Sequence, residues 1–173
     1  MKIGYADPPY VGQAKKHYGK EVSYAGEVDH AQLAIRLLDY DGWALSLSSP
    51  SLPKVISYFP SGTRVAAWVK PFAIFKPGAN PAYAWEPVLF KPARSGKNRV
   101  GGRRDPTVRD WVSCNITLRR GLVGAKPEAF CLWLFDLLGM TIDDSLDDLF
   151  PGTNAVSIAW SKWKANKEVN ANG

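Results

Sequence analysis

The chain has 173 residues, a length that fits one domain, and 46% of them are hydrophobic. That content is enough to bury a core and excludes a disordered protein. The formal net charge of +6 is concentrated, because residues 91–120 carry nine basic and two acidic side chains and the rest of the chain sums to −1. A local basic block favours contact with a polyanion such as nucleic acid, and a solubilising loop is the alternative. The candidate nucleic-acid ligands are Arg94, Lys97, Arg99, Arg103, Arg104, Arg109, Arg119 and Arg120.

Several classes of protein are disfavoured by composition. Cys114 and Cys131 have no second Cys or His nearby at ligand spacing, so neither a zinc site nor a disulfide framework is predicted. The start of the chain reads as a strand and not as a signal peptide, and no apolar run is long enough to span a membrane. We therefore expect a cytoplasmic protein that has no metal and no contact with a membrane.

The first half of the chain alternates between strand and helix. Residues 2–6 form a short apolar strand. Asp29 is suited to cap a helix with apolar positions further along, and a second strand is predicted at 43–47. A short helix should follow, with Ser49 as its cap and Pro50 at its first position.

The second half continues the alternation. Its predicted strands are residues 64–69, 84–90, 111–117 and 145–150. Residues 91–110 should form a basic loop. Pro127 opens a strongly apolar helix that Gly139 ends, and a last helix is predicted at 153–166, followed by a frayed tail at 167–173.

This alternation predicts a single α/β domain over residues 1–173, with a mainly parallel sheet flanked by helices. In such sheets ligands bind at the carboxyl ends of the strands. Residues 7–10 follow the first predicted strand, and residues 150–154 follow the last. These two segments are therefore the first places to look for a site.

The segment after the first strand reads Asp7-Pro8-Pro9-Tyr10. The exocyclic amine of adenine is a poor nucleophile, because its lone pair is delocalised into the ring. A site that methylates it needs acceptors aimed at the amino protons, such as the Asp7 carboxylate and the Pro8 carbonyl, with an aromatic ring such as Tyr10 stacked on the base. The two prolines would hold these groups in place. A plain turn at the end of a strand is the alternative.

Four elements, in this order, resemble a known family, with residues 68–70 and 85–90 together forming the second. Asp7-Pro8-Pro9-Tyr10 is similar to the catalytic motif of adenine-N6 methyltransferases that use S-adenosylmethionine (SAM). Trp68-Val69-Lys70 and residues 85–90, the Lys126-Pro127 element and residues 148–154 resemble segments of the branch related to the eukaryotic messenger-RNA adenosine methyltransferase. The order, with the catalytic motif first and the cofactor turn last, is that of the circularly permuted branch, and short chains of this kind also resemble phage or prophage proteins.

The resemblance implies a reduced Rossmann-like methyltransferase fold, SAM as cofactor and DNA as substrate, with RNA or a nucleotide as alternative acceptors. Asp7, Pro8, Pro9 and Tyr10 would form the catalytic motif, with Asp7 also beside the cofactor. Lys126 would contact the cofactor, whose pocket would be shaped by Asp148, Phe150, Gly152 and Asn154. Asn154 stands where many relatives have a second glycine, and it would either restrict the approach of the backbone or supply a side-chain contact.

A second departure concerns the end of the chain. Only about one predicted helix follows the cofactor turn, whereas methyltransferases of the usual build have further strands there. The cofactor pocket would then be open, partly lost, or completed by another copy in a homo-oligomer. A nucleic-acid-binding protein on a scaffold that has lost catalysis is the alternative from another class.

Two further features leave their roles open. Glu86 is charged within an apolar run, and it would either face the active site or pair with a basic residue. The acidic cluster at Asp143, Asp144, Asp147 and Asp148 favours a solvated turn over a metal site.

Overall fold

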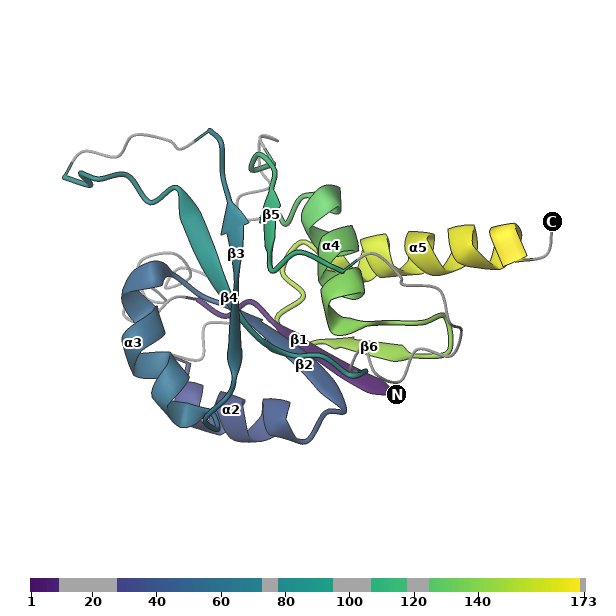
Figure 1. Cartoon of the computed structure of the whole chain (residues 1–173), viewed down its shortest axis with the longest axis horizontal. Helices are drawn as coiled ribbons and strands as arrows, with labels where there is room; N and C mark the ends of the chain where they lie inside the picture. Colours follow the sequence, from purple (N-terminus) through teal and green to yellow (C-terminus); the bar gives the residue numbers. More distant parts are fainter. Residues whose placement is uncertain (10–27, 73–77, 95–106, 118–124, 172–173) are drawn as a thin grey trace.

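The computed structural model describes residues 1–9, 28–72, 78–94, 107–117 and 125–171 (Figure 1). Several of the predicted site residues lie outside these ranges, namely Tyr10, Lys97, Arg99, Arg103, Arg104, Arg119 and Arg120. The predicted loop at 91–110 is described only at its two ends.

Six strands form one sheet in the order β5-β3-β4-β2-β1-β6. They are β1 (Lys2–Ala6), β2 (Gly42–Ser46), β3 (Arg64–Val69), β4 (Trp85–Lys91), β5 (Trp111–Ser113) and β6 (Ser145–Asp148). β1 is parallel to β2 and to β6, and β3 is parallel to β5. β4 runs antiparallel to both β2 and β3. The mainly parallel α/β architecture is therefore confirmed for the described residues, with β4 as the strand of opposite direction.

Helices cover both faces of this sheet. They are α2 (His30–Leu38), η1 (Ser49–Ser51), α3 (Leu52–Val55), η2 (Ile56–Tyr58), α4 (Glu128–Leu138) and α5 (Ala155–Ala171). Figure 1 shows α2 and α3 together on one side and α4 and α5 together on the other. The buried side chains form two corresponding clusters: one joins the sheet to α4 and α5, and the other joins it to α2 and α3. No helix among the described residues is long and apolar enough to cross a bilayer.

The helix ends show why these segments fold as predicted. The Asp29 carboxylate accepts hydrogen bonds from the backbone of Ala31 and Gln32 and so caps α2. Gly139 ends α4 at φ 66°, a left-handed conformation that glycine adopts without a steric cost. Both predicted helix signals are confirmed.

Several predicted boundaries are wrong. The short helical segment begins at Ser49, with Ser48 in the cap position, and the Ser48 carbonyl accepts the Ser51 N–H at 3.0 Å. β5 ends at Ser113 and β6 at Asp148, four and two residues before their predicted ends, and β2 and β4 are each shifted by one residue. Residues 167–171 of the expected frayed tail belong to α5, which continues to Ala171.

The register aligns one end of every strand. Tyr5 on β1 lies beside Asp148 on β6, and Ser46 on β2 lies beside Val88 on β4. Val69 on β3 lies beside both Trp85 on β4 and Ser113 on β5. The carboxyl ends of the five parallel strands and the amino end of β4 therefore meet at one edge, which we call the carboxyl edge. β6 is the last strand of the sheet on its side within the described residues.

Candidate active site

Asp7 lies at the carboxyl edge directly after β1, and its carboxylate is held by Lys126. The Lys126 ammonium is 3.0 Å from the Asp7 Oδ1, and the two side chains are 6% and 23% exposed. Lys126 comes from the segment that leads into α4, 119 residues further along the chain in sequence number. The structure therefore brings together the first and third of the segments that carried the family resemblance.

Glu86 joins the same group of charges from β4. Its Oε2 accepts a hydrogen bond from the Lys126 ammonium at 3.2 Å, and its Oε1 accepts one from Lys70, which directly follows β3. Of the two alternatives for Glu86, pairing with basic residues is confirmed. We call Asp7, Lys126, Glu86 and Lys70 the charge network.

The aromatic rings of Trp68 and Phe130 pack against the lysines of this network. The Lys70 ammonium lies 4.7 Å, and that of Lys126 5.1 Å, from the centre of the Trp68 ring. Trp68 is itself buried and donates its indole N–H to the Cys114 carbonyl at 2.9 Å. Lys126 also lies 5.6 Å from the Phe130 ring centre. Contacts of this kind attract a cation to the face of an aromatic ring, so the two rings help to position both ammonium groups.

Burial and neighbouring charges act in opposite directions on these groups. Burial raises the pKa of the Asp7 carboxyl above its ordinary value, although Lys126 counteracts this shift, and Glu86 adds to the increase. Burial alone would lower the pKa of Lys126, but Asp7 and Glu86 outweigh it and leave that pKa raised. Asp7 is thus a carboxylate that is costly to keep charged and that depends on one buried cation.

The predicted cofactor turn follows β6 at the same edge. The Asp148 carboxylate accepts a hydrogen bond from the Phe150 backbone N–H at 3.3 Å, which fixes the start of the turn. Burial raises the pKa of Asp148, and the charge of Asp7 adds to this increase. Phe150 packs partly buried against the cluster beneath α2 and α3. Asp148 and Phe150 therefore lie at the same edge of the sheet as Asp7.

The last part of the turn leads into α5 through left-handed backbone. Gly152 has φ 47° and Asn154 has φ 57°. The Asn154 carbonyl accepts the N–H of Ile158 at 2.9 Å and so begins the helix. Asparagine tolerates this conformation better than most other residues that carry a Cβ. At Asn154 the chain thus keeps the backbone shape that a glycine would supply.

A pocket of about 490 Å³ opens beside Lys126, and we call it the Lys126 pocket. It lies where α4 and α5 begin, and its lining includes Asn115, Thr117, Glu128 and Thr153. Two helices begin here, and because the first N–H groups of a helix have no partner within the helix, this end favours a ligand with a negatively charged group. In the described residues, no group of three or more His, Cys, Asp or Glu side chains is placed to hold a metal.

Two of the predicted nucleic-acid ligands fall in the described residues. Arg109 is exposed, and its guanidinium stacks on Trp111 at 5.4 Å from the ring centre. Arg94 donates to both carboxylate oxygens of Asp144, at 2.6 and 2.8 Å, and to the Gly139 carbonyl. It lies past the carboxyl end of β4, at the opposite edge of the sheet from Asp7. These contacts give Arg94 a structural task, and we omit it from the proposed nucleic-acid contacts.

The sequence did not assign Lys70 to the site, and it left two alternatives open for Glu86. The signal was present but incomplete: a charged residue inside an apolar strand requires a partner, yet nothing in the sequence shows which of 22 basic residues supplies it. The sequence likewise does not show that Tyr5 and Ser46 are partners. Their buried hydroxyls share a hydrogen bond of 3.0 Å between β1 and β2, near Asp7.

Comparison with known proteins adds evidence on the fold. Neither a scan against protein-family models nor a search of curated proteins gives a match. Among solved structures, the crystal structure of an M1.HpyAVI–SAM complex aligns with a TM-score of 0.59 at 14% identity, covering 95% of this chain and 78% of that chain. A crystal structure of M1.HpyAVI aligns with a TM-score of 0.56 at 14% identity, covering 94% and 76%. This chain shares their fold.

The shared path of the chain agrees with the α/β architecture expected from the sequence. At 14% identity the likeness concerns the path of the chain, and not its individual side chains. The roles of the charge network must therefore be argued from the geometry of this chain.

Proposed function

We propose that this protein transfers a methyl group from SAM to the exocyclic N6 amine of adenine in DNA. The observation that carries the proposal is the ion pair between Asp7 and Lys126 at the carboxyl edge of a methyltransferase fold. It joins a carboxylate from the Asp-Pro-Pro segment to a buried cation that also borders a pocket. This is the edge at which sheets of this type bind their ligands.

The residues at this edge fit SAM in charge and in shape. SAM carries a sulfonium cation, an ammonium group and a carboxylate, and it supplies a methyl group bonded to an electron-poor sulfur. The Lys126 pocket, with its cation and two helix amino ends, would hold the carboxylate. Asp7 and Asp148, both on the neighbouring strand ends, would face the positive groups. The turn at Gly152 and Asn154 would let the backbone approach closely.

Asp7 would act as a hydrogen-bond acceptor for the amine of the base, together with the Pro8 carbonyl. As the new N–C bond forms, the bond between the methyl group and the sulfur of SAM would break, and the neutral thioether would leave. Positive charge develops on the nitrogen, and a fixed carboxylate would stabilise it until the extra proton is lost to solvent. Pro8 and Pro9 restrict the backbone on which these acceptors depend. Lys126 would keep Asp7 oriented and ionised despite its burial. Rate would come from positioning rather than from a covalent intermediate.

The proposal is tested by transfer of a labelled methyl group from SAM to mixed-sequence DNA, followed by nucleoside analysis of the product. We expect label in N6-methyladenine with the wild type and none with an Asp7→Asn variant, which keeps the size of the side chain. An Asp41→Asn variant serves as a control, because that side chain lies at the opposite edge and accepts a hydrogen bond from the Lys2 backbone N–H. Label on another base, or equal transfer by Asp7→Asn, would overturn the proposal.

One observation favours a second candidate, a nucleic-acid-binding protein that has lost catalysis. Within the described residues, the sheet ends at β6 beside the cofactor turn. A second copy of the chain that pairs with or covers β6 would restore a closed pocket, whereas an uncovered β6 would leave SAM weakly held. Calorimetric titration with SAM separates the two, because the non-catalytic candidate binds DNA with a salt-dependent affinity and gives no heat with SAM.

A further inference from the structure

A second pocket, of about 320 Å³, lies at the carboxyl edge and does not include the charge network. It is lined by Ser49, by residues 78–83 and by Trp85, and we call it the Tyr83 pocket. None of these residues lines the Lys126 pocket. The proposed methyl transfer assigns the Tyr83 pocket no task.

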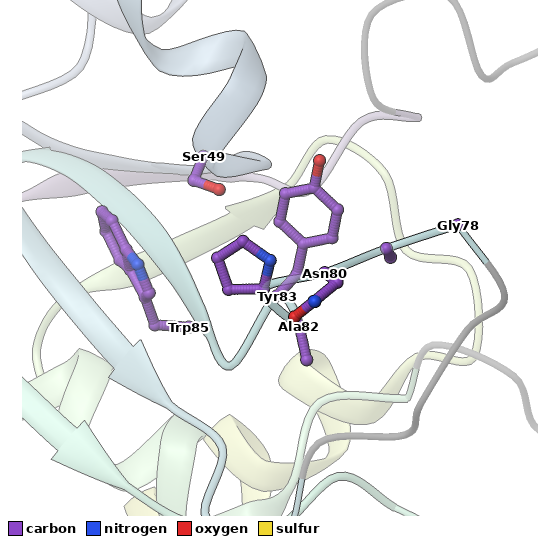
Figure 2. A pocket seen from close by; sticks show the side chains of 8 residues that line it. Ser49, Gly78, Asn80, Ala82, Tyr83 and Trp85 are labelled. Atoms are coloured by element: carbon purple, nitrogen blue, oxygen red, sulfur yellow. The ribbon is translucent and has the colours of Figure 1, made fainter.

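The chemistry of the lining selects a flat and uncharged ligand. No lining residue carries a charge, whereas two are aromatic, and Tyr83 and Trp85 remain 60% and 40% exposed. Figure 2 shows the rings of Tyr83 and Trp85 on different sides of the pocket, with the Ser49 hydroxyl above and the Asn80 amide nearby. Exposed aromatic faces bind rings by stacking, and a few polar groups can contact the ring edge. A nucleobase has both of these features.

The position of the pocket links it to the proposed acceptor. Trp85 is the first residue of β4, and the next residue, Glu86, bonds to the Lys126 ammonium that also holds Asp7. Ser49 lies just beyond β2, the neighbour of β1. Trp85 and Glu86 project to opposite faces of the sheet, so the Tyr83 pocket and the charge network lie on either side of the same carboxyl edge. A strand that passes around this edge could place one base in the Tyr83 pocket and another at Asp7.

The face of the sheet from which Trp85 projects extends from this pocket to Trp111 and the Arg109 guanidinium. Trp85 lies opposite Val69 and Trp111 lies opposite Ala67, so the two tryptophans project from one face. Trp111 is 44% exposed and carries the Arg109 guanidinium over its ring. Strand spacing places the two tryptophan Cα atoms roughly 12 Å apart, a span of a few nucleotides. Arg109 is thus placed to contact a phosphate of a strand whose base occupies the Tyr83 pocket.

We propose that the Tyr83 pocket binds an unpaired base of the DNA strand that carries the target adenine, close to the target at the same edge of the sheet. This inference rests on the proposed function, and it assigns single-stranded DNA as the form of the substrate. A base in a duplex has both faces covered by its neighbours, so only an unpaired base can present a face to Tyr83 or Trp85.

The test measures binding without SAM, by fluorescence anisotropy of a labelled single-stranded DNA of twelve nucleotides with one central adenine. Its comparison strand has abasic residues on both sides of that adenine. Stacking on an aromatic side chain predicts that the wild type binds the intact strand roughly 5- to 100-fold more tightly than the abasic strand. In a Tyr83→Leu variant this ratio should fall toward one, and in a Tyr83→Phe variant it should be retained. Tyr58→Leu, which changes a 37%-exposed tyrosine outside the pocket, should leave the ratio unchanged.

Several results would overturn the inference: equal binding of intact and abasic strands by the wild type, an unchanged ratio in Tyr83→Leu, or a Tyr83 effect found only with RNA or only with duplex DNA. A Tyr83-dependent dimer in sedimentation, without a base effect, would assign the pocket to a second copy instead. Base-dependent binding without methyl transfer would overturn the proposed function alone. Methylation of the abasic strand as fast as the intact one would overturn this inference alone.

Discussion

The protein buries ionic groups at both ends of its sheet, and the two sets differ in how their carboxylates are held. At the carboxyl edge, Asp7 has the Lys126 cation, which it shares with Glu86. At the opposite edge, Asp144 accepts from Arg94 through both of its oxygens and lies 2.9 Å from the Met1 ammonium. Asp144 also accepts from the backbone N–H of Thr141 at 2.7 Å. One carboxylate is thus sparsely paired, and the other is fully satisfied.

The pKa values of the two carboxyls move in opposite directions as a result. Burial raises the pKa of Asp7, and Lys126 does not fully offset it. Burial acts on Asp144 in the same sense, but hydrogen bonds from Arg94, the amino terminus and Thr141 lower its pKa far below the ordinary value. A buried carboxylate with spare acceptor capacity suits a site that must bind a ligand, whereas a saturated one suits a structural task.

The largest expected effect is that of Lys126→Met. It removes the cation and leaves the Asp7 and Glu86 carboxylates buried without it, so Asp7 should become protonated and lose its acceptor role. We expect methyl transfer to fall by roughly 10²- to 10³-fold, measured as kcat/KM. Lys70→Met is the matched control, because Lys70 bonds to Glu86 but not to Asp7. Equal losses in the two variants would show that overall charge, and not the contact with Asp7, matters.

Asp144→Asn should act on stability instead. Its side chain is fully buried, so the change leaves Arg94 and the amino terminus without their anion. We expect a loss of about 3 kcal/mol in the free energy of unfolding, measured by urea denaturation. Asp143→Asn, at an exposed neighbouring position, should change stability by less than about 0.5 kcal/mol.

The same variant predicts a pH dependence. Because the folded-state pKa of Asp144 is lowered, its contribution is fully present above the unfolded value of about 3.9 and is lost as the pH falls below it. The stability difference between wild type and Asp144→Asn should therefore shrink as the pH is lowered from 6 toward 3. A difference that stays constant with pH would contradict a role for the ionised group.

Glu86→Gln should reduce the rate by a smaller factor than Lys126→Met, and it should also shift the pH profile. Residues that orient a functional group typically contribute 10- to 100-fold, and we expect a loss of about that size in kcat/KM. The Glu86 charge raises the pKa of Asp7, so its removal should lower that pKa. If transfer requires the Asp7 carboxylate, the acidic limb of kcat/KM must then shift to lower pH. A rate loss without this shift would assign Glu86 a packing role only.

Local signals account for the parts of the fold that the sequence predicts well. The predicted bounds of β1 and β3 agree with the structure, and Asp29 and Gly139 mark helix ends through their own side-chain and backbone chemistry. Where the predicted bounds are wrong, the end of the element depends on a tertiary contact or on a weak local signal. β5 ends early at Ser113, and the Cys114 carbonyl beyond it accepts the Trp68 indole. α5 continues to Ala171 because its polar end contains no helix-breaking proline or glycine.

The residues of the candidate site also fall into two groups: those that local motifs identify and those that only the folded structure brings together. Asp7 and Lys126 were identified through motifs of adjacent residues, and the structure brings them within 3.0 Å of each other. Glu86 and Lys70 enter the site only because β3 and β4 pair in a register that brings their ends to the carboxyl edge. Pairing of this kind depends on tertiary structure, and no local pattern in one sequence encodes it.

Substitutions of Asn154 should have the smallest effect. They decide whether this position supplies a backbone conformation or a side-chain contact to the cofactor. Its φ of 57° is strained for most residues that carry a Cβ, so Asn154→Ala should lower the free energy of unfolding by about 1 kcal/mol. Asn154→Gly should leave stability nearly unchanged, because glycine adopts this conformation freely. If backbone shape is what the position supplies, Asn154→Gly also keeps its affinity for SAM in calorimetric titration. A stable Asn154→Gly variant that binds SAM more weakly would show instead that the amide side chain contacts the cofactor.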